Sequence, residues 1–187
     1  YPIGLGENNA RFGMQGADYT GFLKQGTTDG PIQGLAFDCF AYHMMQATSL
    51  DFTNVAFVKL DVEGFEIAVL KGAQNSLFRP GNSKIGGMLM EVGPGRWNRA
   101  SVDFATGVEQ MKKLADHFKT SYILIKTMGS YAKTCPTSLV EGVFPHGKKP
   151  SSEMETLQMF TVDMNDFEPL LARMKEKDYD CNFFFKN

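Results

Sequence analysis

The chain has 187 residues, with 19 Lys and Arg against 21 Asp and Glu and a formal net charge of −2. It lacks the clustered basic surplus of a nucleic-acid-binding protein, so no nucleic-acid partner is expected. Although 43% of the residues are apolar, no apolar run approaches the ~20 residues that a membrane span needs. The length and composition predict one folded domain with a sizeable core.

The three cysteines, Cys39, Cys135 and Cys181, lie far apart in the chain and are odd in number. They form neither a CxxC pair nor a Cys/His ligand spacing, so the sequence supports neither a disulfide framework nor a zinc site. We therefore expect no metal and mildly favour a reducing compartment or an organelle interior.

The first 36 residues are rich in glycine, and two short strands are expected among turns, Ala10–Met14 and Ile32–Ala36. Gly4-Leu5-Gly6 is not a phosphate-binding loop, because neither the phosphate-loop nor the dinucleotide-binding glycine pattern is present. A short helix is expected over Phe37–Ala47.

The central stretch Val55–Ala73 reads VAFVKLDVEGFEIAVLKGA. An apolar run typical of a strand is followed by an acidic turn and then by a helical pattern. This order is the unit of a doubly wound α/β sheet, and such sheets bind ligands at the carboxyl ends of their strands. Asp61, Glu63 and Glu66 follow such an end closely, so we expect the functional site here.

The helix after the acidic turn is expected to run to about Phe78, because Pro80 and Gly81 follow. The remaining pattern predicts strands over Gly86–Val92, Ser121–Lys126, Leu157–Val162 and Cys181–Phe185, and helices over Phe104–Lys119 and from the N-cap Asn165 to about Lys177. Residues 128–156 are irregular, which is long for a connection inside a compact domain.

The segment KLDVEGFEIAVLKGA resembles the signature of the FkbM-type methyltransferases. Leu89-Met90-Glu91-Val92, with Pro94 soon after, resembles the next strand of that family, and Asp180–Phe185 resembles its closing strand. The resemblance spans about Ile3 to the end, so residues 1–187 are expected to form one domain. It implies an S-adenosylmethionine-dependent class I enzyme with a Rossmann-like α/β fold.

The chain departs from the family's pattern at its start. Family members hold S-adenosylmethionine with a glycine-rich V-D-x-G-A-N-x-G loop after strand one and an acid after strand two, and no segment here matches that loop. Gly4–Asn9 resembles instead the segment just after strand three. On this alignment the domain is partial, and its sheet is incomplete at the N-terminal strands.

An incomplete sheet has an exposed parallel edge, which is an aggregation hazard unless it is covered. The chain begins with Tyr1 rather than Met, which indicates a processed chain or part of a longer one. We expect either a preceding N-terminal segment or another chain of a larger protein assembly to cover the edge.

The resemblance and the chemistry of methyl transfer imply roles for the polar side chains around the acidic turn. Asp61 and Glu63 are the expected catalytic residues, because a carboxylate near the methyl donor can take the acceptor's hydroxyl proton or orient the acceptor. The side chains expected to bind the acceptor are Glu66, Glu91, Arg96 and Trp97, with Trp97 stacking on a sugar or aromatic ring.

Each of these residues also has a purely structural explanation. Asp61 also fits a structural turn or helix-cap acid, and acids such as Glu63 and Glu66 at a helix N-terminus contribute roughly 0.3–1 kcal/mol to stability. Glu91 also fits a buried, hydrogen-bonded acid, and Arg96 with Trp97 fits a packed turn.

Two functions follow from these alternatives. One is O-methylation of a hydroxyl on a sugar or small metabolite with S-adenosylmethionine, which the intact DVEGFE segment favours. The other is a non-catalytic, methyltransferase-like subunit with a structural or interaction role in a larger assembly, which the missing cofactor loop favours.

Overall fold

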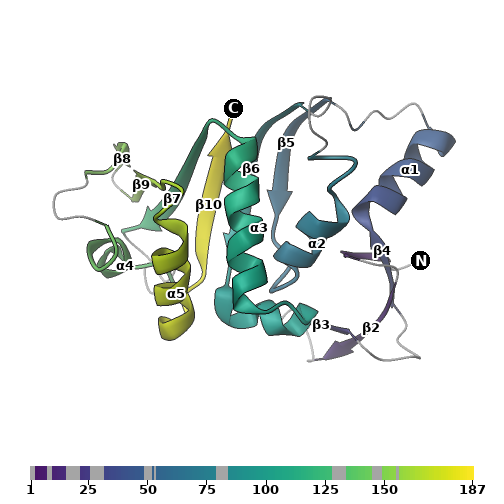
Figure 1. The fold of residues 1–187 in the computed structure, drawn as a ribbon, viewed down its shortest axis with the longest axis horizontal. Coiled ribbons are helices and arrows are strands. Elements are labelled where there is room, and N and C mark those ends of the chain that lie inside the picture. The colour runs from purple at the N-terminus through teal and green to yellow at the C-terminus, as the bar shows by residue number, and fades with distance from the viewer. Residues whose placement is uncertain are drawn as a thin grey trace.

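The computed structural model describes residues 3–7, 10–15, 22–25, 32–48, 52, 54–78, 84–127, 134–144, 149–154 and 156–187. The fold is α/β and contains two sheets, one with strand order β1-β4-β2-β3 and a larger one with order β5-β6-β10-β7-β9-β8 (Figure 1). None of the helices in these ranges is both long enough and apolar enough to cross a bilayer.

The smaller sheet contains β1 (Ile3–Gly6), β2 (Ala10–Gln15), β3 (Phe22–Gln25) and β4 (Ile32–Ala36). β1 runs parallel to β4, and β2 is antiparallel to both β3 and β4. Helix α1 (Phe37–Ala47) follows β4 directly. The two strands and the helix predicted in this region are confirmed.

The larger sheet is mixed and contains β5 (Asn54–Leu60), β6 (Lys84–Val92), β7 (Thr120–Lys126), β8 (Ser152–Met154), β9 (Leu157–Thr161) and β10 (Cys181–Lys186). β5 and β6 are parallel, whereas β10 lies between β6 and β7 and is antiparallel to both. Within the described chain β5 is an edge strand whose sheet partner is β6. This is the parallel edge that the sequence leads us to expect.

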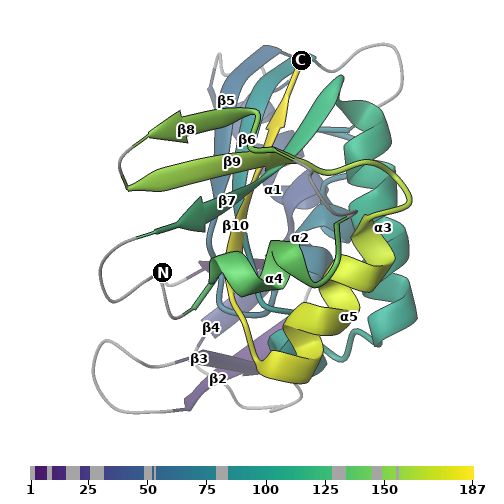
Figure 2. The same cartoon turned by 90° about the vertical axis from the view of Figure 1, so that its left-hand side faces the viewer.

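The remaining helical elements are α2 (Glu66–Gly72), the 3-10 helix η2 (Pro94–Ala100), α3 (Phe104–His117), α4 (Thr137–Glu141) and α5 (Phe167–Lys177). Helices α2, α3 and α5 cover one face of the larger sheet (Figures 1 and 2). Alternation along β10 buries Phe183 and Phe185 under these helices, where they contact Phe167 and Phe118. Because β5 and β6 run parallel, with α2 as the crossover between them, their carboxyl ends lie at the same edge of the sheet.

Helix α2 ends at Gly72, so the predicted extension to Phe78 is wrong. Residues 73–77 form turns instead. The carboxylate of Asp38 accepts hydrogen bonds from the backbone N–H groups of Asn75 (3.0 Å) and Ser76 (2.8 Å). Glycine is a poor helix former, and Asp38 binds amides that a continuing helix would use, so the chain leaves the helix there.

Two further expectations are corrected in the second half of the chain. The N-cap of α5 is Asp166 rather than Asn165, and the Asp166 carboxylate accepts a hydrogen bond from the N–H of Asp163 (3.0 Å). The stretch 128–156 is not wholly irregular, because α4 and β8 form within it. Both elements are short, which explains why periodicity did not reveal them.

A disulfide joins Cys135 to Cys181, a pairing that the spacing of the cysteines in the sequence did not support. The two residues are 46 positions apart, and the fold alone brings them together. Cys39 keeps a free thiol. Because disulfides persist mainly in oxidising environments, the bond also argues against the reducing compartment that the cysteine count favoured.

Candidate functional site

The acidic turn at the end of β5 has a backbone that only certain residues adopt. Glu63 has φ 53° and Gly64 has φ 102°, both in the left-handed region. A Cβ at Gly64 would lie 2.6 Å from the carbonyl oxygen of Arg96. The turn therefore requires glycine at this position, and it packs directly on η2.

Three carboxylates meet where β5 and β6 end. Asp61, Glu63 and Glu91 each place an oxygen within 4.8 Å of the others. Asp61 and Glu63 belong to the acidic turn, and Glu91 lies near the end of β6. The structure thus brings together three of the residues selected from the sequence, because the carboxyl ends of parallel strands lie at the same edge.

Arg96 joins this acidic group through its guanidinium. One terminal nitrogen donates to Glu63 Oε2, and the other lies 3.2 Å from Glu91 Oε1 and 2.7 Å from Asp180 Oδ1. The Arg96 side chain is only 16% exposed. Burial alone would lower the pKa of Arg96, but the charges of Asp180 and Glu63 outweigh it and raise the pKa. Arg96 therefore stays cationic. We call Arg96, Glu63, Glu91 and Asp180 the Arg96 cluster.

Asp180 is a member of this cluster that the sequence did not single out. It directly precedes β10, and its backbone N–H donates to Thr134 O at 3.0 Å. Burial raises the pKa of Asp180, and the nearby Arg96 acts in the opposite direction. No local motif marks Asp180, because its position beside Arg96 depends on β10 pairing with β6.

Glu66 lies beneath the turn rather than on the solvent side. Its side chain is fully buried. Its Oε1 accepts the N–H of Gly64 at 2.7 Å, while Oε2 has no hydrogen-bond partner among the described residues. Burial raises the pKa of Glu66 from 4.5 to about 7. A carboxyl with this pKa is partly protonated at neutral pH.

Trp97 is also buried, at 1% exposed. Its ring stacks on Phe104 with the centroids 6.1 Å apart. It covers Gly107 so closely that a Cβ there would lie 2.0 Å from the ring. The indole consequently presents no open face to solvent, and it anchors η2 to α3.

Asp61 differs from the other acids because it stands outside the Arg96 cluster. Its carboxylate pairs with Lys59 at 3.1 Å, and both side chains are exposed. Exposed pairs of this kind contribute only ~0–1 kcal/mol, so a ligand can displace Lys59 at little cost. Asp61 is therefore the acid most available to an incoming group.

The three carboxylates have the oxygen ligands that Mg²⁺ and Ca²⁺ prefer. Arg96, however, already pairs with one oxygen of Glu63 and one oxygen of Glu91. The arrangement therefore fits an arginine-centred ion-pair group better than a metal site.

The implied cofactor, S-adenosylmethionine, fits the described residues only in part. The exposed carboxylates of Asp61 and Glu63 have the charge that suits its cationic methyl-donor end. The glycine-rich loop that the family resemblance implies for this cofactor has no match in the sequence, and the described part of the larger sheet has no strand beyond β5. The described residues therefore supply carboxylates of suitable charge but not the glycine-rich loop.

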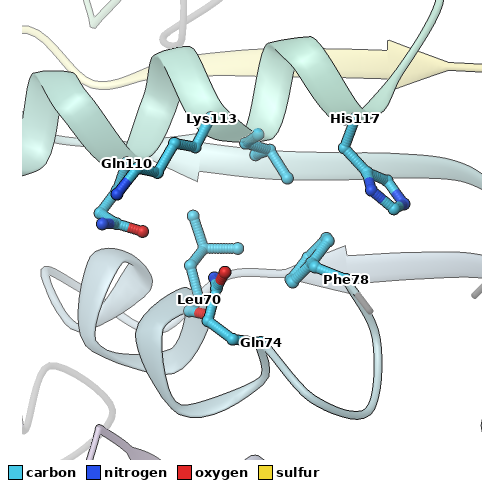
Figure 3. A pocket seen from close by; sticks show the side chains of 7 residues that line it. Leu70, Gln74, Phe78, Gln110, Lys113 and His117 are labelled. Atoms are coloured by element: carbon cyan, nitrogen blue, oxygen red, sulfur yellow. The ribbon is translucent and has the colours of Figure 1, made fainter. Parts of the chain in front are cut away.

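A separate small cavity, of about 70 Å³, lies between α2 and α3 (Figure 3). Its lining residues are Leu70, Gln74, Phe78, Gln110, Lys113, Leu114 and His117. Burial lowers the pKa of His117, whose ring meets Phe78 edge-on. None of the residues selected from the sequence lines this cavity, so it is distinct from the acidic edge.

Comparison with protein families gave a match for this chain. The family model described as "Methyltransferase FkbM domain" matches residues 15–119. The match covers more than half of the 187 residues and includes β5, the acidic turn, α2, β6, η2 and α3. The comparisons with curated proteins and with solved structures gave no match.

Proposed function

Because the chain belongs to the family of FkbM methyltransferase domains, we propose that it forms the acceptor side of an S-adenosylmethionine-dependent O-methyltransferase. The proposed acceptor is a hydroxyl on a sugar or small metabolite. We further propose that residues 1–187 are a single, partial domain of the Rossmann-like class I fold. The parallel β5–β6 pair with its crossover helix supports this assignment.

One observation carries the catalytic part of the proposal. Asp61 is an exposed carboxylate at the carboxyl end of a parallel strand, inside the family's signature segment, and it does not belong to the Arg96 cluster. Ligands of open α/β sheets bind at this end of the strands. Asp61 therefore combines position, exposure and chemistry suited to a general base.

The proposed reaction transfers a methyl group to oxygen. Bound S-adenosylmethionine supplies an electrophilic methyl group. Asp61 takes the proton of the acceptor hydroxyl on its carboxylate as the new oxygen–carbon bond forms. A positioned base of this kind contributes roughly 10²–10⁴-fold to rate.

The remaining selected residues have positioning roles in this proposal. Glu63 orients the acceptor while Arg96 fixes the Glu63 side chain. Glu91 and Arg96 form the polar wall of the acceptor site. Glu66 and Trp97, both buried, hold the turn and η2 in place from below.

A second candidate function, a non-catalytic subunit of a larger assembly, rests on a different observation. The sheet face opposite the helices carries a row of aromatic rings in which Phe184 contacts Phe57 (6.4 Å) and Tyr122 (6.1 Å). Phe57 is 52% exposed on the edge strand β5. An exposed apolar edge can accept a strand from another chain, so this surface supports an interaction role.

Calorimetric titration with S-adenosylhomocysteine and S-adenosylmethionine separates the two candidates. The enzyme proposal predicts a measurable heat of binding, weak but saturable, because at least the methyl-donor end of the ligand meets the acidic edge. Absence of heat at millimolar ligand would contradict the enzyme proposal and leave the interaction role as the better account.

A further inference from the structure

We propose that the Cys135–Cys181 disulfide is a redox-sensitive lock on the Arg96 cluster: in its oxidised form it holds Asp180 against Arg96, and its reduction loosens the acidic turn. The inference concerns the conformation of the site and does not require methyl transfer. It links a covalent bond on one side of β10 to the turn at the end of β5.

The first step of the coupling runs from the disulfide to Asp180. Cys181 is the first residue of β10 and the immediate neighbour of Asp180. The N–H of Asp180 donates to the carbonyl oxygen of Thr134 at 3.0 Å, and Thr134 directly precedes Cys135. One covalent bond and one hydrogen bond thus tie residues 134–135 to residues 180–181.

The second step runs from Asp180 to the turn. Asp180 Oδ1 lies 2.7 Å from a terminal nitrogen of Arg96, and the other terminal nitrogen of Arg96 donates to Glu63. Glu63 holds a left-handed backbone conformation, which is unfavourable for a residue with a side chain and persists only where surrounding contacts impose it. Weakening the contact of Asp180 with Arg96 therefore weakens one of the contacts that hold Glu63. Another is Arg99, which donates to the Glu63 carbonyl oxygen at 3.0 Å.

The segment 134–144 needs the disulfide because its own structure is small. Helix α4 has only five residues, far fewer than an isolated helix needs to form in water. Leu139 and Val140 are buried, and α4 lies against α5 (Figure 2). When the disulfide breaks, these contacts and the packing of the buried Phe144 on Phe160 (ring centroids 6.2 Å apart) are left to hold the segment, so its opening becomes more frequent.

The redox step balances with a small dithiol as the reductant. The Cys135–Cys181 sulfur–sulfur bond breaks, the dithiol gives up two electrons and two protons, and it closes to its own disulfide while two cysteine thiols form. Both cysteines are buried. The reductant therefore reacts only when the segment 134–144 opens, so reduction of the disulfide is slow.

Hydrogen–deuterium exchange of the full chain tests the proposal, read by mass spectrometry over residues 61–66, 93–99 and 134–144. The oxidised protein is compared with the protein held reduced by dithiothreitol and with the double variant C135S/C181S. We expect exchange to become about tenfold faster in all three ranges when the disulfide is absent. C39S, which removes the free thiol, should leave all three ranges unchanged.

The variant D180N distinguishes coupling through Asp180 and Arg96 from a general rise in exchange over the whole protein. In oxidised D180N, exchange should rise in residues 61–66 and stay unchanged in residues 134–144, and reduction should add little more to the turn. The exposed acid Asp116 provides the matched control, D116N, which should behave as the unmodified protein. If C135S/C181S fails to fold, reduction and D180N still give the answer.

Faster exchange confined to residues 134–144 after reduction would overturn the proposal, because the disulfide would then hold only its own segment. Unchanged exchange of residues 61–66 in D180N would overturn it as well. Both readouts are independent of catalysis, so a failure of the proposed methyl transfer would not affect them.

Discussion

The α-carbon of Gly64 faces the backbone of Arg96 so closely that a Cβ would lie 2.6 Å from the Arg96 carbonyl oxygen. Gly64 also has φ 102°, which side chains rarely tolerate. The contact ties the acidic turn to η2. It also explains why glycine follows the two acids in the signature segment.

Substitution of Gly64 by alanine should destabilise the fold by roughly 2–4 kcal/mol, since it adds both a clash and a strained backbone. Urea unfolding measures the loss. Gly142 provides the matched control, because its φ is −84° and a Cβ there would meet nothing nearer than 3.4 Å. Equal stability losses in G64A and G142A would contradict the account.

Glu66 should make stability fall as pH rises through the acidic range. The pKa of this carboxyl is raised to about 7 in the folded chain, from an ordinary 4.5. Between those two values the unfolded chain gives up the proton more readily than the folded one. The loss in free energy of unfolding therefore grows from pH 4.5 to 7 and then levels off at about 3 kcal/mol.

The substitution E66Q tests this, because glutamine keeps an oxygen for the Gly64 N–H and cannot ionise. Thermal unfolding midpoints of E66Q and the parent protein should agree near pH 4.5 and diverge in favour of E66Q at pH 7 and above. If the difference between the two midpoints does not change with pH, Glu66 is not the titrating group.

Removal of the Arg96 charge should cost more than removal of a surface arginine. R96Q leaves Glu63, Glu91 and Asp180 close together without their shared cation, and we expect a loss of about 2–3 kcal/mol at neutral pH. R173Q is the control, because Arg173 pairs with Glu176 on the exposed surface of α5 and should contribute under ~1 kcal/mol. Comparable losses in both variants would mean that the Arg96 cluster is not a structural centre.

Reduction of the disulfide should lower the free energy of unfolding by about 4 kcal/mol. This is the loop-closure value for a bond between two cysteines 46 positions apart. Guanidinium unfolding with and without a dithiol measures this loss, and C39S serves as the control. An unfolding curve insensitive to the dithiol would show that the bond is absent from the folded protein.

The signature segment and the strand that follows it could be predicted because their physics is local. The apolar run of β5, the acidic turn and the glycine all lie within a few residues, and the amphipathic spacing of α3 is equally local. Parallel pairing of β5 with β6 then places Glu91 beside Asp61 and Glu63, so this part of the site follows from the strand ends alone.

The parts that the sequence did not reveal depend on distant contacts. Asp180 reaches Arg96 only because β10 inserts between β6 and β7. Cys135 meets Cys181 for the same reason, and no spacing rule signals the pair. Trp97 was expected to face a ligand, but the absence of a side chain at Gly107 creates the space that buries it. Tertiary packing, rather than residue type, decided these positions.

The central claim is that Asp61 accepts the proton of the acceptor hydroxyl. Its most direct test is transfer of a labelled methyl group from S-adenosylmethionine to a panel of sugar and small-metabolite hydroxyls, measured for the parent protein, D61N and the control D116N. The account predicts that D61N loses roughly 10²–10⁴-fold in turnover and binds S-adenosylhomocysteine as the parent does, while D116N keeps full activity. Undiminished methyl transfer by D61N, or no transfer by the parent to any hydroxyl acceptor, would contradict it.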